Sequence, residues 1–147
     1  MSPNPVRILL VEDDPDHAML TMRSLRKGGF TEQVLWVKDG REALDFLHRR
    51  ADYADPTAAP RPDLILLDLN LPKLDGMTVL RDLKQSDCLR CIPVVVLTTS
   101  RRQDEISRAY HEGANSYVTK PVQFADFAER IRVLGAYWLA TSCLPSA

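Results

Sequence analysis

Three short runs of the sequence are almost continuously apolar: residues 6–11, interrupted only by Arg7, residues 64–67 and residues 94–97. Two further runs, residues 34–37 and 116–119, are rich in β-branched and aromatic side chains. Continuous apolarity, in contrast to an alternating pattern, is typical of strands that are buried on both faces, as in a parallel sheet covered by helices. The pattern therefore predicts five strands.

Segments with helical periodicity lie between these runs. In the first, Ala18, Met22 and Leu25 recur at helical spacing after Asp14, which can cap the helix, and Pro15, which suits its first turn. Further helices are expected at about residues 40–47, 76–83 and 104–111. The last helix has the clearest apolar stripe, which consists of Phe124, Phe127, Ile131, Leu134 and Trp138.

Strand and helix alternate five times, so right-handed crossovers predict a three-layer, doubly wound α/β sandwich with a central parallel sheet. The 147 residues fit a single domain. We expect its core over about residues 6–135, followed by a helical extension and tail at residues 136–147. One connection, residues 49–63, is unusually long. It is either a plain surface insertion or a loop that a partner recognises.

The composition is that of a globular protein, with 45% hydrophobic residues, 27% charged residues and a net charge of -1. A charge so close to zero argues against broad attachment to nucleic acid or anionic lipid. Neither a membrane-spanning stretch nor a signal peptide is apparent, so we expect a cytoplasmic protein. Cys88 and Cys91 have the spacing of a redox or metal half-site, but no further ligands stand nearby at motif spacing. Two reduced thiols are the simpler interpretation.

Residues that carry chemistry follow four of the five expected strands. Glu12 and Asp13 follow the first strand, Asp68 the third and Lys120 the fifth, while Thr98 ends the fourth. In an open parallel sheet these strand ends meet at the functional crevice. Each residue taken alone could cap a helix, satisfy the backbone or face solvent. Their convergence on one edge of the sheet is what favours a functional site.

Clustered acids need compensation, because two carboxylates about 4 Å apart repel by roughly 4 kcal/mol at an effective dielectric constant near 20. A divalent cation such as Mg²⁺ or Mn²⁺, bound by Asp13 and Asp68 with Glu12 beside them, supplies it. A metal-bound carboxylate facing a lysine and a hydroxyl suits phosphoryl transfer. Asp68 would be the nucleophile, while Lys120 and Thr98 would each contact a phosphoryl oxygen.

Four motifs occur in order, each at an expected strand end: Val-Glu-Asp-Asp at 11–14, Asp-Leu-Asn-Leu-Pro-Lys-Leu-Asp-Gly at 68–76, Leu-Thr-Thr-Ser at 97–100 and Lys-Pro at 120–121. Through them the chain resembles the receiver domains of two-component response regulators over almost its whole length. The resemblance implies a flavodoxin-like fold with five helices and a five-stranded parallel sheet of order 2-1-3-4-5.

The resemblance also implies roles for individual residues. Asp68 becomes the phosphorylation site, and the backbone carbonyl of Asn70 joins Glu12, Asp13 and Asp68 at the metal. The peptide bond between Lys120 and Pro121 is expected to be cis.

Tyr117 looks like the aromatic switch residue that swings inward in this family when the threonine, here Thr98, moves toward the phosphoryl group. It can equally be read as a half-buried aromatic residue of an edge strand.

The expected output is a contact with another protein, because no DNA-binding or enzymatic domain follows residue 147. The resemblance implies a single-domain regulator, phosphorylated by a sensor histidine kinase and not itself an enzyme beyond turning over its own phosphoryl group. Segments 97–100, 113–122 and 137–145 resemble regulators paired with phytochrome-type kinases.

The C-terminal helix is more apolar than one buried face requires. Val133, Tyr137, Trp138 and Leu139, together with Leu144-Pro145, predict a homodimer through this region. The alternative is that the tail folds back onto its own domain.

Three rival interpretations remain. An aspartyl phosphatase of the haloacid dehalogenase type needs a second acid two residues after its nucleophile, where Asn70 stands. A flavodoxin-like carrier needs a phosphate loop after the first strand, where the acids at 12–14 would repel a phosphate. A degenerate receiver that only binds partners would share the fold, but the intact acid, threonine and lysine set argues against it.

Overall fold

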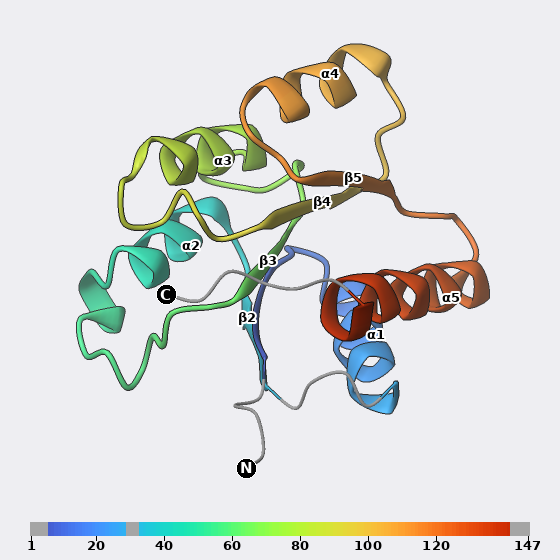
Figure 1. Cartoon of the computed structure of the whole chain (residues 1–147), viewed down its shortest axis with the longest axis horizontal. Coiled ribbons are helices and arrows are strands. Elements are labelled where there is room, and N and C mark those ends of the chain that lie inside the picture. The colour runs from blue at the N-terminus through green and yellow to red at the C-terminus, as the bar shows by residue number, and fades with distance from the viewer. Residues whose placement is uncertain (1–5, 29–32, 142–147) are drawn as a thin grey trace.

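The computed structural model describes residues 6–28 and 33–141, with side chains as far as Trp138. The described residues form one parallel sheet of five strands in the order β2-β1-β3-β4-β5. The strands are β1 (Arg7–Val11), β2 (Gln33–Val37), β3 (Leu64–Leu67), β4 (Val94–Thr98) and β5 (Ser116–Thr119). Figure 1 shows the sheet with its helices, and the predicted fold and strand order are confirmed.

The helices follow the strands in turn as α1 (Pro15–Lys27), α2 (Gly40–Leu47), α3 (Gly76–Gln85), α4 (Gln103–His111) and α5 (Phe124–Gly135). The first three begin at aspartates whose side chains accept hydrogen bonds from backbone N–H groups of the first turn: Asp14, Asp39 and Asp75. Such caps satisfy donors that the helix itself leaves unpaired. The sequence signal for these helix starts is therefore local.

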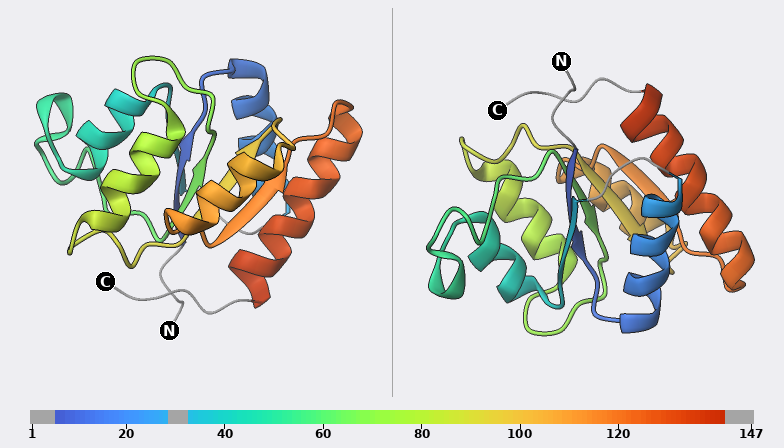
Figure 2. Two further views of the ribbon diagram at one scale, coloured as in Figure 1. Left: turned by 90° about the horizontal axis from the view of Figure 1, so that it is seen from above. Right: turned by 90° about the horizontal axis from the view of Figure 1, so that it is seen from below.

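Helices cover both faces of the sheet, as Figure 2 shows for α2 and α3 on one side and α1 and α5 on the other. Side chains alternate between the faces, so Leu9 and Val11 pack with α2, α3 and α4, whereas Ile8 and Leu10 pack with α1 and α5. Each fully buried aliphatic side chain stabilises the fold by about 1.5–3 kcal/mol. The apolar runs seen in the sequence thus supply two cores, one on each face.

The long connection between α2 and β3 is not a loose insertion. It contains the 3₁₀ turn η1 (Ala51–Tyr53), and the Tyr53 ring lies edge-on to Phe46 with centroids 5.1 Å apart. The Tyr53 hydroxyl donates a hydrogen bond of 2.6 Å to Glu42, and Ala59 is 1% exposed. The connection therefore packs against α2 and adds to the core on that face.

The C-terminal helix departs from the expected stripe at both ends. Phe124, at the first position of α5, is 62% exposed because it lies before the helix reaches the core. After Gly135 the chain continues as the π-helix η2 (Ala136–Thr141), where Trp138 is partly buried against the α1 and α5 core. Leu144, Pro145 and the third cysteine, Cys143, lie outside the described residues.

Candidate functional site

The predicted site residues meet at the carboxyl edge of the sheet. One carboxylate oxygen from each of Glu12, Asp13 and Asp68 lies within 4.8 Å of the other two. The Nζ atom of Lys120 contacts the same cluster through Asp68. Three backbone hydrogen bonds explain this placement: Asp68 N–H donates to Val11 O at 3.0 Å, Glu12 N–H to Val37 O at 3.1 Å and Lys120 N–H to Thr98 O at 2.7 Å. The ladder thus extends one residue past each strand and fixes the first residue beyond it.

Lys120 is the centre of the site. It is 4% exposed, and its ammonium donates to Asp68 Oδ2 at 2.9 Å and to Glu12 Oε2. Burial alone would lower the pKa of Lys120, but the charges of Asp68 and Glu12 and their hydrogen bonds outweigh it and raise this pKa above its ordinary value. The lysine is therefore a fixed positive charge between two carboxylates that come from different strands.

The three acids differ in their surroundings. Glu12 is 1% exposed, and burial together with the nearby charge of Asp68 raises its pKa to about 7 despite the contact with Lys120. Asp68 is 6% exposed, and its Oδ1 accepts a hydrogen bond of 3.0 Å from the Asn70 N–H. Asp13 is exposed. A set of clustered carboxylate oxygens, open to water on one side, fits a hard divalent cation.

Thr98 and Asn70 lie on the other side of Asp68. Thr98 is fully buried, and its hydroxyl oxygen is 3.5 Å from both Asn70 Nδ2 and the Ser100 N–H nitrogen. Asn70 itself is exposed. These long contacts hold the threonine hydroxyl weakly, which leaves it able to form a stronger hydrogen bond with an incoming anion.

Tyr117 is half-buried on β5 and packs against the core formed with α2, α3 and α4. Its hydroxyl donates to Ser100 O at 3.0 Å, and its own N–H donates to the hydroxyl of Tyr110 at 3.1 Å. Ser100 therefore links the tyrosine to the loop that follows Thr98 at the end of β4.

One expectation for the site is wrong. The described residues contain no cis peptide bond, so the bond between Lys120 and Pro121 is trans. A bond before proline favours trans by about 0.5–1 kcal/mol. Because Lys120 contacts both Glu12 and Asp68 from the trans arrangement, the lysine contacts do not require the less favourable isomer.

His17 is a neighbour of the site that the sequence analysis missed. Its Nδ1 lies 3.3 Å from Lys120 Nζ, and its ring stacks on Phe127 of α5 with centroids 5.5 Å apart. Its position on the first turn of α1, just beyond the acids, was the available signal. A histidine there has many structural roles, however, and only the fold shows that it faces the lysine.

The chain is similar to known proteins over most of its length. The family described as response regulator receiver domain matches residues 8–132. The probable methanogenesis regulatory protein FilR2 of Methanothrix harundinacea is 46% identical, over 97% of this chain and 89% of its own. The response regulator Rcp1 of Synechocystis is 40% identical, with coverages of 97% and 95%.

Two solved structures resemble the whole fold. The Mn²⁺-bound form of Rcp1 has a TM-score of 0.91 at 39% identity, covering 97% of this chain and 100% of the other. The phosphorylated cyanobacterial phytochrome response regulator RcpA also has a TM-score of 0.91, at 40% identity and coverages of 97% and 99%.

Among the helices described here, none combines the length and apolarity needed to cross a bilayer.

Proposed function

Because the chain belongs to the response regulator receiver domain family, we propose that it accepts a phosphoryl group on Asp68 from a sensor histidine kinase. One observation carries the proposal: Asp68 lies with buried Glu12 and Lys120 and exposed Asp13 in one cluster at the edge of the sheet where strand ends meet. The signal then leaves through contacts with other proteins. The protein turns over its own phosphoryl group but has no other substrate.

In the proposed reaction an Asp68 carboxylate oxygen attacks the phosphorus of a phosphohistidine. A P–O bond forms, the P–N bond breaks, and the imidazole nitrogen keeps the electron pair. Lys120 pairs with one phosphoryl oxygen and Thr98 donates a hydrogen bond to another. Glu12, Asp13, Asp68 and the Asn70 carbonyl would hold Mg²⁺ or Mn²⁺, which neutralises charge on the phosphoryl oxygens when bound.

The proposed switch uses Thr98 and Tyr117. The Thr98 hydroxyl has only long contacts at 3.5 Å, so a phosphoryl group offers it a stronger partner. Its movement would alter the loop at Ser100, whose carbonyl accepts the hydrogen bond from Tyr117. The aromatic ring would then change its position at the α4 and β5 surface.

We further propose a phytochrome-type kinase as the donor and the cytoplasm as the location. Support comes from the similarity to Rcp1 and to the phytochrome response regulator RcpA, which extends over 97% of the chain. Whether the chain ends the pathway or relays the phosphoryl group onward depends on the partner that it meets next.

The same regulator is proposed to act as a homodimer through its C-terminal helix. Val133 and Tyr137, on α5 and η2, are 53% and 55% exposed, and Tyr110 of α4 is 48% exposed. They border a hollow over β5 that Trp138 and Leu134 also line. A second copy that covers this surface would remove large apolar side chains from water.

Intact mass spectrometry tests the proposed reaction. The protein is incubated with acetyl phosphate, with and without Mg²⁺, as the wild type and as Asp68→Asn. We expect the wild type to gain one phosphoryl group that hydroxylamine removes, only when Mg²⁺ is present, and the variant to gain none. A wild type that gains nothing under any condition would instead indicate a receiver fold that only binds partners. A phytochrome-type kinase carrying a labelled phosphohistidine then tests the choice of donor.

A further inference from the structure

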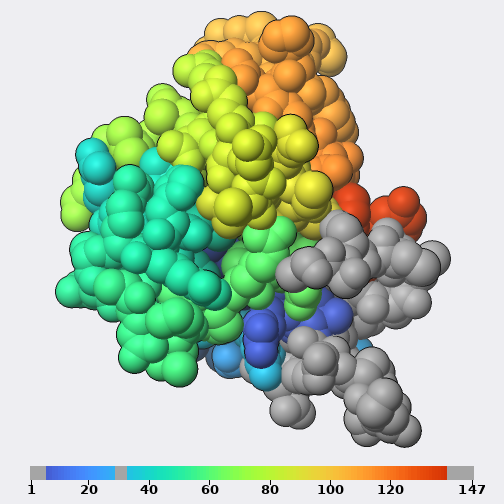
Figure 3. Space-filling model, turned by 60° about the vertical axis from the view of Figure 1, so that its left-hand side comes forward, coloured from blue at the N-terminus to red at the C-terminus, as the bar shows by residue number. Residues whose placement is uncertain are grey.

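The long connection between α2 and β3 builds a cavity of about 160 Å³ at the opposite edge of the sheet from Asp68. Its walls are the end of α2, the last residues of the connection, and the turn between α3 and β4. Figure 3 shows this part of the surface, where the teal and green segments lie beside the yellow one. The cavity residues play no part in the proposed phosphoryl transfer.

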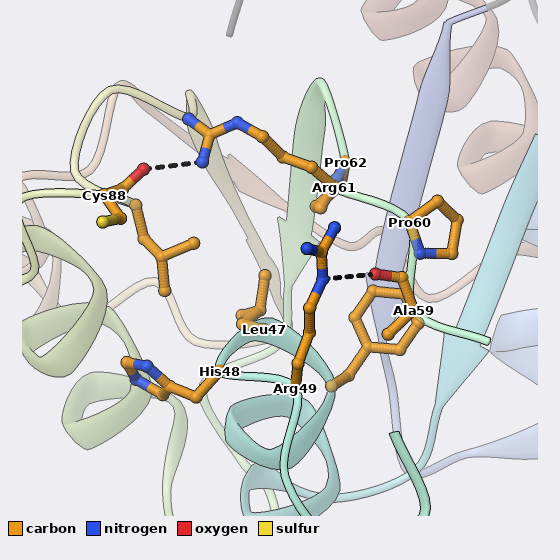
Figure 4. A pocket seen from close by; sticks show the side chains of 10 residues that line it. Leu47, His48, Arg49, Ala59, Pro60, Arg61, Pro62 and Cys88 are labelled. Carbon is orange, nitrogen blue, oxygen red and sulfur yellow. Dashed lines mark hydrogen bonds between the residues drawn. The ribbon is translucent and has the colours of Figure 1, made fainter. Parts of the chain in front are cut away.

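Two guanidinium groups line the cavity, and both are held by backbone carbonyls. Arg49 Nε donates to Ala59 O at 3.1 Å, and Arg61 Nη1 donates to Cys88 O at 2.6 Å. Figure 4 shows the two side chains extending across the cavity from different parts of the connection. Each keeps further N–H donors, and neither forms an ion pair with a carboxylate in the part of the chain that the structure describes.

The residues that line the cavity carry only positive charge. Its lining contains Arg49, Arg61 and His48 but no acidic residue. The acid that contacts the lining residue His48 is Asp82, whose Oδ1 lies 2.7 Å from His48 Nε2. In a chain with a net charge of -1, two positive charges without acidic partners around one hollow create a local preference for an anion. A guanidinium pair suits planar carboxylates and phosphates in particular.

The floor of the cavity is apolar. It is formed by Leu47, Leu89 and Phe46, which are 8%, 7% and 3% exposed, together with Pro60 and Pro62. The cavity volume is smaller than the roughly 300 Å³ at which sites for drug-sized molecules begin. The ligand must therefore be small, with one charged end and a short apolar body.

We propose that this cavity binds a small organic anion, either a carboxylate or a phosphate monoester. Arg49 and Arg61 contact its charged end, and its apolar part rests on Leu47 and Leu89. Arg49 follows the C-cap of α2 with a φ of 54°, a left-handed conformation that commonly ends a helix, and its Nε donates to Ala59 O.

Titration of the full-length ¹⁵N-labelled protein tests the proposal in metal-free buffer at constant ionic strength. The probes are benzoate, phenyl phosphate and inorganic phosphate. We expect saturable amide shifts at Leu47, Arg49, Arg61 and Leu89 with benzoate or phenyl phosphate, and about tenfold weaker binding in Arg49→Gln. Arg50→Gln is the matched control, because Arg50 is the exposed neighbour that faces Asp45 at 3.6 Å. It should bind as the wild type does.

Cys88 gives a second readout that does not depend on a variant. It lines the cavity and is exposed, as is Cys91, which does not line it. A bound probe should slow the alkylation of Cys88 and leave that of Cys91 unchanged, as measured by peptide mass spectrometry. The proposal is overturned if no probe saturates below about 10 mM, if Arg49→Gln binds as tightly as the wild type, or if both cysteines react at unchanged rates.

Discussion

At the scale of single residues, the proposed metal site makes Glu12 the carboxylate at which protons and the divalent cation are expected to compete. Its carboxyl group is buried beside Asp68, and its pKa is raised to about 7. A cation needs the ionised carboxylate, so acid should weaken binding. We expect the Mg²⁺ affinity to be constant above pH 8 and to fall by up to about tenfold per unit below pH 7, as measured by calorimetric titration.

The same proton should have the opposite effect on the stability of the metal-free protein. Between about pH 4.5 and pH 7 the unfolded chain carries Glu12 ionised, whereas the folded chain binds a proton there. This contribution to the free energy of unfolding is therefore complete below pH 4.5 and lost as the pH rises through 7. Glu12→Gln removes both effects, and an Mg²⁺ affinity that is equal at pH 6 and pH 8 in the wild type would contradict the assignment.

The meeting of the site residues at one edge of the sheet could be predicted from the sequence, but their detailed contacts could not. Glu12, Asp13, Asp68 and Lys120 follow strands, and parallel strands bring their ends together whatever the details of packing. The approach of His17 to Lys120 depends instead on how α1 lies against α5, through the His17 and Phe127 rings. Such a contact between helices has no signature in a local sequence pattern.

At the scale of elements, the start of α3 is fitted closely against the loop that carries Asp68. The N–H of Gly76 donates to Leu69 O at 2.9 Å, and a Cβ at this position would lie 2.2 Å from Asp68 O and 2.6 Å from Leu69 Cα. These are backbone atoms, which cannot rotate away as a side chain can. Glycine is thus required here by the close approach of two chain segments.

Gly76→Ala should therefore destabilise the protein by about 1–3 kcal/mol, the usual cost of forcing atoms into a packed region. It should also slow the phosphorylation of Asp68, because the loop must shift to make room. Urea unfolding and the acetyl phosphate assay measure the two effects. Ser107→Ala, an exposed change on α4, serves as the control. A Gly76→Ala protein with the wild-type unfolding midpoint would contradict this prediction, because it would show that the chain accommodates a Cβ at position 76 without loss of stability.

Element boundaries were predictable where the signal is local, and less so where it is not. The fifth strand lies at residues 116–119 as expected, and α2 and α3 begin at the expected glycines behind Asp39 and Asp75. Phe124 belongs to the apolar stripe of the last helix in the sequence but is exposed in the structure. Periodicity shows which face of a helix is apolar but not where along the helix the core ends. The π-helical turn after Gly135 changes that spacing again.

At the scale of the whole molecule, α5 and η2 expose the apolar side chains of Val133 and Tyr137 among the residues that the structure describes. If this surface joins two copies, Val133→Asp should place a carboxylate in an apolar interface and weaken the dimer by at least about tenfold. Sedimentation velocity at tens of micromolar gives the mass. Met19→Asp on α1 is the control, since Met19 and Val133 are both 53% exposed. A wild type that sediments as a monomer would remove the basis for the proposed dimer.

Lys120 has one more consequence for the molecule as a whole. By contacting Glu12 and Asp68 it links the ends of β1, β3 and β5 through protein atoms alone, as an internal counter-ion. When all three acids of the cluster are ionised, they and the one ammonium carry two net negative charges, which one divalent cation would balance. We therefore expect the fold to persist without the cation, in contrast to small domains that unfold when a chelator removes their zinc. On that expectation, magnesium binds and leaves during signalling while the protein stays folded.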